Sequence, residues 1–351
     1  MDRPDGFEGP PSPTVFPDDD GPRPPSTPRA LPPGNRGRGE ARAKRQAELA
    51  LTDTWRPRWL WAAFAVPGGL WLILLFVIPF YAMIAVAAGQ LQPFFGTPVA
   101  TWNPLHWVAA NFIAIWQDLS GPHSFIGPAA IRTVIYTAIA SALSLVIAYP
   151  VAYFVTRFAG KRRGLFLILI VAPFWVSYMM RMLAWIDLLQ TNGYVNQAIS
   201  FLHLTSQPVN WLGGEHYTVI LGLVYGYIPY LIVVLYAGLD RIDSRLLEAS
   251  RDLGLGRART FWRVTIPLSR PTILAGMLVT VLPMLGDYYT NQLLSATPST
   301  TMIGNQIESM LSSPGQGGEG AALSLLMLVV LVVPMLYYVI STARASRLGG
   351  I

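Results

Sequence analysis

The residues of this sequence that could do chemistry are few, and they gather in one charged stretch and at two acidic positions. The stretch "EASRDLGLGRARTFWRVTIP", residues 248–267, carries two acids and several arginines between two apolar runs. Asp187 and Asp287 lie within or at the ends of apolar runs. An ionisable side chain there costs free energy, so a functional role is the first hypothesis for each. Groups of this kind can hold a protein partner or a cationic ligand.

Familiar catalytic motifs are absent from the sequence. It has no cysteine, which excludes disulfides, thiol nucleophiles and cysteine-bound metals. Its lysines, Lys44 and Lys161, lie outside any G-x-x-x-x-G-K-[ST] loop, so we expect no ATP site in this chain. The four histidines lack metal spacing and are interpreted as surface or interfacial residues. We therefore predict a protein that is no enzyme and holds no cofactor or metal, with a membrane-embedded enzyme left open as an alternative.

The elements that must position these groups are predicted to be membrane-spanning helices. Only 13% of the 351 residues are charged, against about a quarter in soluble domains. Six apolar runs each reach the roughly 20 residues that cross a bilayer. They cover residues 59–88, 128–157, 164–190, 217–239, 271–293 and 320–342.

The first 57 residues differ from the rest in composition. They are rich in Pro, Gly, Asp and Arg, and such a segment buries too little apolar surface to fold. We predict a disordered cytoplasmic tail over 1–57 and a six-span domain over 58–348. The basic part, "RGRGEARAKRQ", is interpreted as a solvated flank, with contact to anionic lipid heads as the alternative.

Basic residues alternate strictly between successive connecting segments. Residues 1–58 hold ten Lys or Arg and residues 240–270 hold seven, whereas 89–127, 191–216 and 294–319 hold none. The positive-inside rule then places both termini and the charged stretch in the cytoplasm. The same rule accounts for the net charge of +6, so nucleic acid is not expected as a partner.

The charged stretch is predicted to fold as two short helices over residues 244–266. Asp243 or Ser244 can cap the first helix, and Gly254 can end it. Its apolar-to-small stripe is formed by Leu246, Leu247, Ser250 and Leu253, with the charged residues on the other face. The second helix, "RARTFWRV", is expected to end at Pro267, after which Ser269 can cap the next span. Such a capped hairpin indicates a docking element.

This segment resembles the EAA motif of bacterial ABC importer permeases, which reads Glu-Ala-Ala, three residues, Gly, nine residues, Ile-x-Leu-Pro. Here the matching residues are Glu248, Ala249, Ser250, Gly254, Val264, Ile266 and Pro267, with serine in place of the third alanine. The resemblance implies the type I importer arrangement of six transmembrane helices in the bacterial cytoplasmic membrane, and a coupling helix that docks on a separate ATPase. The residues to which it assigns coupling are Glu248, Ala249, Ser250, Asp252, Gly254, Phe261 and Pro267.

The resemblance extends over residues 59–348 and narrows to the spermidine/putrescine type, closer to the first permease of that system. It rests on "APFWVSYMMRMLAWIDLLQTNGYVNQAI", on the segment that contains the motif, and on "MIGNQI" and "RASRL". It implies a second permease, two ATPase subunits that bind ATP and Mg, and an external binding protein. Polyamines are the expected cargo, and iron(III) or another small solute is the alternative.

A polyamine would suit carboxylates flanked by aromatic faces, through ion pairing and cation–π contact. We therefore predict a translocation path that includes Asp187 and Asp287, with the aromatic residues near them in sequence, which are Trp175, Tyr178, Trp185, Tyr288 and Tyr289. The alternatives stay open. Asp187 could instead pair with Arg181 or Arg132, and the aromatic residues could pack the bundle or form an interfacial belt.

Overall fold

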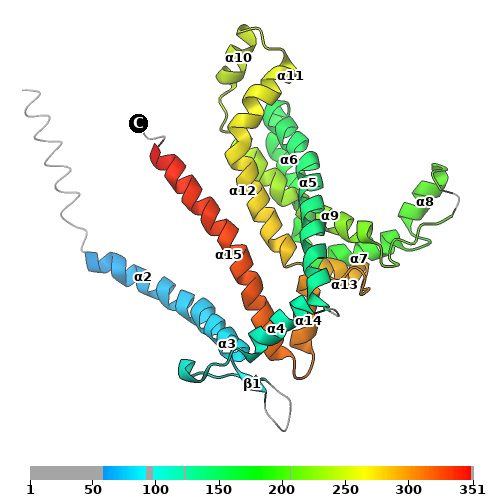
Figure 1. Cartoon of the computed structure of the whole chain (residues 1–351). Coiled ribbons are helices and arrows are strands. Elements are labelled where there is room, and N and C mark those ends of the chain that lie inside the picture. Colours follow the sequence, from blue (N-terminus) through cyan, green and yellow to red (C-terminus); the bar gives the residue numbers. More distant parts are fainter. Residues whose placement is uncertain (1–57, 92–97, 122–123, 206, 349–351) are drawn as a thin grey trace, which may run out of the picture. The chain divides into compact units, whose positions relative to one another are not determined.

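The computed structural model describes residues 58–91, 98–121, 124–205 and 207–348 (Figure 1). The predicted tail over 1–57 lies outside these residues. By its internal contacts the chain divides into two units, residues 1–71 and 72–351.

Helices account for nearly all of the described secondary structure. Their bounds in chain order are α2 Arg58–Leu72, π-helix η1 Ile73–Val77, α3 Ile78–Ala87, η2 Pro104–His106, α4 Ala110–Ser120, α5 Ile126–Arg157, η3 Gly160–Arg162, α6 Arg163–Val171, η4 Ala172–Trp175, α7 Tyr178–Leu189, α8 Tyr194–Phe201, α9 His216–Leu239, α10 Ser244–Asp252, α11 Arg257–Thr260, π-helix η5 Phe261–Thr265, α12 Ile266–Leu285, α13 Tyr289–Leu294, α14 Ile303–Ser312 and α15 Gly317–Leu348. The described strands are β1 Gln90–Leu91 and β2 Pro98–Val99, which pair antiparallel.

The predicted spans agree in number with the helices. Five described helices are long and apolar enough to cross a membrane, and they cover 63–87, 126–157, 216–239, 257–285 and 317–340. The sixth predicted span, 164–190, is a pair of helices, Gly160–Trp175 and Tyr178–Leu189, bent by 88°. Pro173 lies in the 3-10 turn before the bend, and Val176 is extended. The chain is therefore an all-α membrane protein with six spans when the bent pair counts as one.

The fifth span differs from its prediction, because Pro267 does not end a helix. Residues 257–285 run through as one helix, and Pro267 lies in the first turn of α12. The π-helical turn η5 comes just before it, and the Ile266 N–H bonds the Phe261 carbonyl five residues back. This wider turn accommodates a residue that lacks an N–H. The predicted cap at Ser269 is also wrong, because its hydroxyl donates to the Ile266 carbonyl at 3.0 Å, inside the helix.

Helices α5, α9 and α12 pack side by side (Figure 1). Small buried residues recur every four positions along α5, at Ala140, Ser144, Ala148 and Ala152. This stripe lets the backbone of a neighbouring helix approach closely, as is usual between helices in membranes. Leu231, Leu235 and Leu239 of α9 pack against it.

Helix α15 packs against α3, α4 and α14. Ala321, Ala322 and Leu323 near its start are buried together with Ile115 of α4 and Ile126 of α5. Farther along α15, aliphatic residues such as Val329, Val330 and Val333 are exposed. An exposed aliphatic surface on a helix of this length suits contact with lipid.

Candidate functional site

Asp287 is the centre of the candidate site. It lies in the break between α12, which ends at Leu285, and α13, which begins at Tyr289. The residue is only 7% exposed. Its Oδ1 accepts the Thr290 N–H at 2.9 Å, and its Oδ2 accepts the Thr290 hydroxyl at 2.8 Å. The break therefore holds a buried acid in a fixed orientation.

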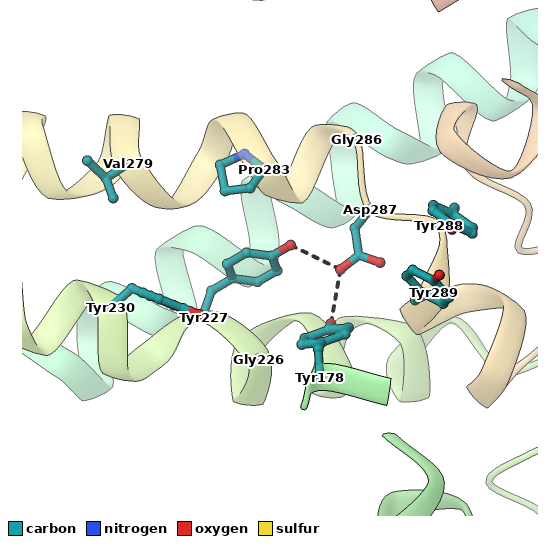
Figure 2. A pocket seen from close by; sticks show the side chains of 10 residues that line it. All are labelled: Tyr178, Gly226, Tyr227, Tyr230, Val279, Pro283, Gly286, Asp287, Tyr288 and Tyr289. Carbon is teal, nitrogen blue, oxygen red and sulfur yellow. Dashed lines mark hydrogen bonds between the residues drawn. The ribbon is translucent and has the colours of Figure 1, made fainter. Parts of the chain in front are cut away.

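Two tyrosines from other helices complete the shell around this acid. The Tyr178 hydroxyl donates to Asp287 Oδ2 at 3.0 Å, and the Tyr227 hydroxyl donates to the same atom at 3.1 Å (Figure 2). The Tyr178 hydroxyl also hydrogen-bonds the Thr290 hydroxyl. In all of these contacts the Asp287 oxygens accept hydrogen bonds.

The bend before α7 brings Tyr178 to the acid. Ser177 begins α7 as its N-cap, and its hydroxyl accepts the Met180 N–H at 3.3 Å. Tyr178 then lies across α9 at Gly226, where a Cβ would come within 2.8 Å of Tyr178 Cε2. The ring can occupy this place because Gly226 has no side chain.

A cavity of about 550 Å³ opens beside the carboxylate. Figure 2 shows the side chains that converge on it from α7, α9 and the α12–α13 break. The residues that line it are Tyr178, Gly226, Tyr227, Tyr230, Val279, Pro283, Gly286, Asp287, Tyr288 and Tyr289.

The cavity combines one negative charge with aromatic faces. The rings of Tyr288 and Tyr289 stack with their centroids 4.1 Å apart. Hydrogen bonding to Tyr289 raises the pKa of Tyr288 to about 12, so this hydroxyl is protonated at pH 7. Aromatic faces attract cations, and a buried carboxylate pairs with them. The arrangement can therefore hold an organic ammonium group.

Of the residues predicted to form a path, four meet in this cavity: Asp287, Tyr178, Tyr288 and Tyr289. The other three lie elsewhere. Trp175 is 90% exposed. Trp185 packs edge-on against Tyr225 at 5.2 Å. Asp187 is exposed and accepts a hydrogen bond from Gln190.

The alternative partners considered for Asp187 are not beside it in the described structure. Arg132 donates to the carbonyls of Pro298 and Thr301. Arg181 is buried, and its guanidinium lies over the ring of Phe174 at 4.1 Å from the centroid. Phe174 precedes the 88° bend and Arg181 follows it, so this cation–π contact joins the two halves of the bent pair.

The sequence interpretation missed Tyr227, Tyr230 and Thr290. Tyr227 is 60 positions from Asp287, a separation that no local pattern connects. The cluster "YGYIPY", which places tyrosines on both sides of Pro229 in an apolar run, was the available indication.

The charged hairpin, residues 244–265, is the second candidate site. The Asp243 carboxylate accepts the Arg245 N–H at 2.9 Å, and α10 begins at Ser244. Gly254 follows α10 with φ of +84°, in the left-handed region that favours glycine. Figure 1 places α10 and α11 together at one end of α12.

One serine connects the two helices of the hairpin. The Ser250 hydroxyl donates to the Leu247 carbonyl at 2.8 Å and to the Thr260 hydroxyl at 3.1 Å. Ser250, Leu247 and Thr260 are all buried. The serine that replaces the third alanine of the motif thus pins α10 to α11.

The outer face of the hairpin is more apolar than predicted. Leu246 and Leu253 were expected in one stripe with Leu247 and Ser250, but unlike these two buried residues they are 52% and 83% exposed. Of the predicted coupling residues, Glu248, Ala249 and Asp252 are also exposed. Phe261 is half-buried, with its ring edge-on to Tyr149 and Tyr153 of α5. An aromatic residue therefore anchors the hairpin on the bundle, and leucines, acids and arginines are exposed on its surface.

The fold and these two sites define a polytopic membrane protein with a charged hairpin at one end of its bundle. Residues 51–347 match the family described as "Binding-protein-dependent transport system inner membrane component". The chain belongs to this family, and it is a multi-pass inner membrane permease subunit of an ABC importer.

Curated relatives align with this chain over most of their own length. The spermidine/putrescine transport system permease protein PotB of Escherichia coli (strain K12) is 30% identical over 243 residues, which are 68% of this chain and 86% of the relative. PotB of Haemophilus influenzae is 31% identical over 288 residues, which are 79% of this chain and 91% of the relative.

Solved structures support the fold. A chain from the crystal structure of a bacterial ABC transporter involved in the import of the acidic polysaccharide alginate superposes with a TM-score of 0.57. The identity is 20%, with 82% of this chain and 96% of that chain covered. A chain from the alginate transporter in complex with an alginate pentasaccharide-bound periplasmic protein gives a TM-score of 0.60. The identity is 18%, with coverage of 80% and 92%.

Proposed function

We propose that this permease translocates polyamines and that their ammonium groups pass through the cavity beside Asp287. The observation that carries the proposal is a 7% exposed carboxylate in a cavity that five tyrosines line. The names of the relatives, which are spermidine/putrescine permeases, support the same cargo.

The chemistry of the cavity fits a flexible polycation. An ammonium group can donate to the Asp287 carboxylate in place of a tyrosine hydroxyl, and it adds the attraction between opposite charges. The methylene chain between two ammonium groups can lie against tyrosine rings. Val279 and Pro283 add apolar surface on the α12 side.

The cargo is tested with the whole transporter reconstituted in liposomes with its binding protein. We expect spermidine or putrescine to stimulate ATP hydrolysis and to be taken up, and iron(III) to do neither. Stimulation by iron(III) alone would reject the polyamine assignment.

We propose further that the hairpin docks on a separate ATPase subunit, which binds ATP and Mg, and that this chain has no ATPase site. The exposed residues Glu248, Ala249 and Asp252 and the two outer leucines support a docking face. The Glu248→Arg variant should lose ATPase co-purification, because it reverses the charge at one position of that face. Glu215→Arg, at the opposite end of α9 from the hairpin, is the matched control and should retain it. Normal binding and transport by Glu248→Arg would contradict the proposal.

The same hypothesis gives the partners and the orientation. The complex would contain this chain, a second permease, two ATPase subunits and an external binding protein, with the hairpin and both termini in the cytoplasm. Because the sequence has no cysteine, single cysteines report their side of the membrane directly. Leu253→Cys in the hairpin should react with an impermeant thiol reagent only from the cytoplasm, and Phe201→Cys in α8 only from outside. The opposite pattern would reverse the topology.

A further inference from the structure

A second cavity, of about 490 Å³, lies between the hairpin and the end of α5. The translocation path does not account for it, and of its lining residues only Glu248 also belongs to the proposed docking face. The residues that line it are Tyr153, Arg157, Phe158, Ser244, Leu247, Glu248, Arg251, Arg257, Ala258 and Phe261.

The charges in this cavity do not cancel. Three arginines, Arg157, Arg251 and Arg257, line it together with one acid, Glu248. None of the four takes part in an ion pair within the described residues, where the single ion pair joins Arg163 to Asp240. Three like charges around one cavity repel each other, and an anion among them would relieve that repulsion. The cavity is therefore built to attract a negative group.

Two hydrogen bonds fix the side chain of Arg157. Its Nη2 donates to the Leu239 and Ile242 carbonyls, at 3.3 and 3.0 Å, where α9 ends. Its Nε is buried and has no hydrogen-bond partner in the described structure. A fixed arginine with a spare donor loses little conformational entropy when an anion binds, and guanidinium matches the geometry of phosphate oxygens.

The position of the cavity relative to the membrane indicates which kind of molecule supplies the anion. Arg157 is the last residue of the span 126–157, so the cavity lies where that helix leaves the membrane. Tyr153 and Phe261 form apolar walls of the cavity. Phe158, which follows Arg157 in the chain, is 67% exposed. Basic pockets between transmembrane helices at the cytoplasmic surface bind the head groups of acidic lipids.

We propose that this cavity binds the phosphate head group of an anionic phospholipid, with the acyl chains alongside Phe158. The three arginines bind the phosphate, and Ser244 can donate a further hydrogen bond. The excess of positive charge favours an acidic lipid over a zwitterionic one. The lipid would occupy the membrane side of the hairpin and brace it against the bundle while its outer face stays free for the ATPase.

The test uses the assembled transporter in detergent and follows lipid binding by native mass spectrometry. Phosphatidylglycerol, phosphatidylethanolamine and phosphatidylcholine are titrated in parallel, together with inorganic phosphate. The variant Arg251→Gln with Arg257→Gln removes two of the three cavity cations. The matched control, Arg259→Gln with Arg263→Gln, removes two exposed cations of the same hairpin that do not line the cavity.

We expect the cavity variant to bind phosphatidylglycerol roughly 30-fold more weakly than the wild type, and the control to bind it normally. Equal affinity in both variants would overturn the proposal. Equal binding of phosphatidylethanolamine, or of inorganic phosphate in place of lipid, would also overturn it. Loss of the ATPase subunit with unchanged lipid binding would assign the cavity to an acidic side chain of that partner instead.

Discussion

The hydroxyl of Tyr178 and the carboxylate of Asp287 meet at 3.0 Å, although 109 positions separate them in the chain. Two irregularities make the contact possible. The bend before α7 turns Tyr178 into the bundle, and the break after α12 exposes the Asp287 carboxylate to it. The candidate cation site is therefore located where two spans depart from regular helix.

Replacing Asp287 by Asn should impair uptake strongly while leaving the complex assembled. The change keeps the shape but removes the charge, and the loss of one charge from a buried, hydrogen-bonded pair costs about 2 kcal/mol or more when the cargo is a cation. Uptake of labelled spermidine at low concentration should fall about 30-fold. Asp187→Asn is the matched control, because Asp187 is exposed and outside the cavity. A larger defect in Asp187→Asn would move the site to that residue.

Replacing Gly226 by Ala should displace the Tyr178 ring. The new methyl group would lie 2.8 Å from Tyr178 Cε2, and such overpacking costs about 1–3 kcal/mol. A lower melting temperature and slower uptake are expected. Gly164→Ala in α6 is the control, because a Cβ there meets nothing within 4 Å. That variant should be neutral or slightly stabilising. Equal effects of the two substitutions would show that the close approach of Tyr178 to α9 is unimportant.

Replacing Gly254 by Ala should strain the turn of the hairpin without any clash. No atom lies within 4 Å of the added Cβ, but φ is +84°, which costs an L-residue about 1–2 kcal/mol. Substrate-stimulated ATPase activity should fall several-fold in the reconstituted complex. Gly256→Ala has an equally open site and an ordinary φ of −66°, so its activity should match the wild type. Indistinguishable variants would mean that the turn geometry does not matter for coupling.

Replacing Ser250 by Ala restores the family motif yet should weaken this hairpin. The change removes the bond between α10 and α11 and leaves the buried Thr260 hydroxyl without that partner, at a cost of about 1 kcal/mol. Faster hydrogen exchange across residues 244–260 should report it. Ser250→Ala combined with Thr260→Val should recover protection, because no unpaired hydroxyl is left. If the double variant does not recover protection from hydrogen exchange, this hydrogen bond does not stabilise the hairpin.

The number of spans could be predicted because the bilayer imposes a minimum apolar length that each run meets. The course of the fifth span could not be predicted, because a proline such as Pro267 usually ends or kinks a helix. Here the π-helical turn η5 accommodates the proline, and Phe261, the first residue of that turn, packs against Tyr149 and Tyr153, more than 100 positions away in the chain. The hairpin was predictable because its cap and its glycine are local features.

The site was only partly predictable, for geometric reasons. Asp187 lies nine positions beyond Tyr178 (187 − 178), and at about 100° per residue this puts the two on opposite faces of α7. Helical periodicity could therefore have excluded Asp187. Tyr227 could not have been assigned, because its contact with Asp287 depends on the packing of α9 against α12.

The unbroken course of residues 257–285 through Pro267 has a mechanical consequence. A helix of 29 residues is about 43 Å long, and this one starts in the hairpin and stops two positions before Asp287. Had Pro267 been a hinge, motion of the hairpin would have been dissipated at the membrane surface. A continuous helix can instead transmit a rotation from one end to the other, so we expect a partner that turned the hairpin to change the position of the Asp287 carboxylate relative to Tyr178 and Tyr227.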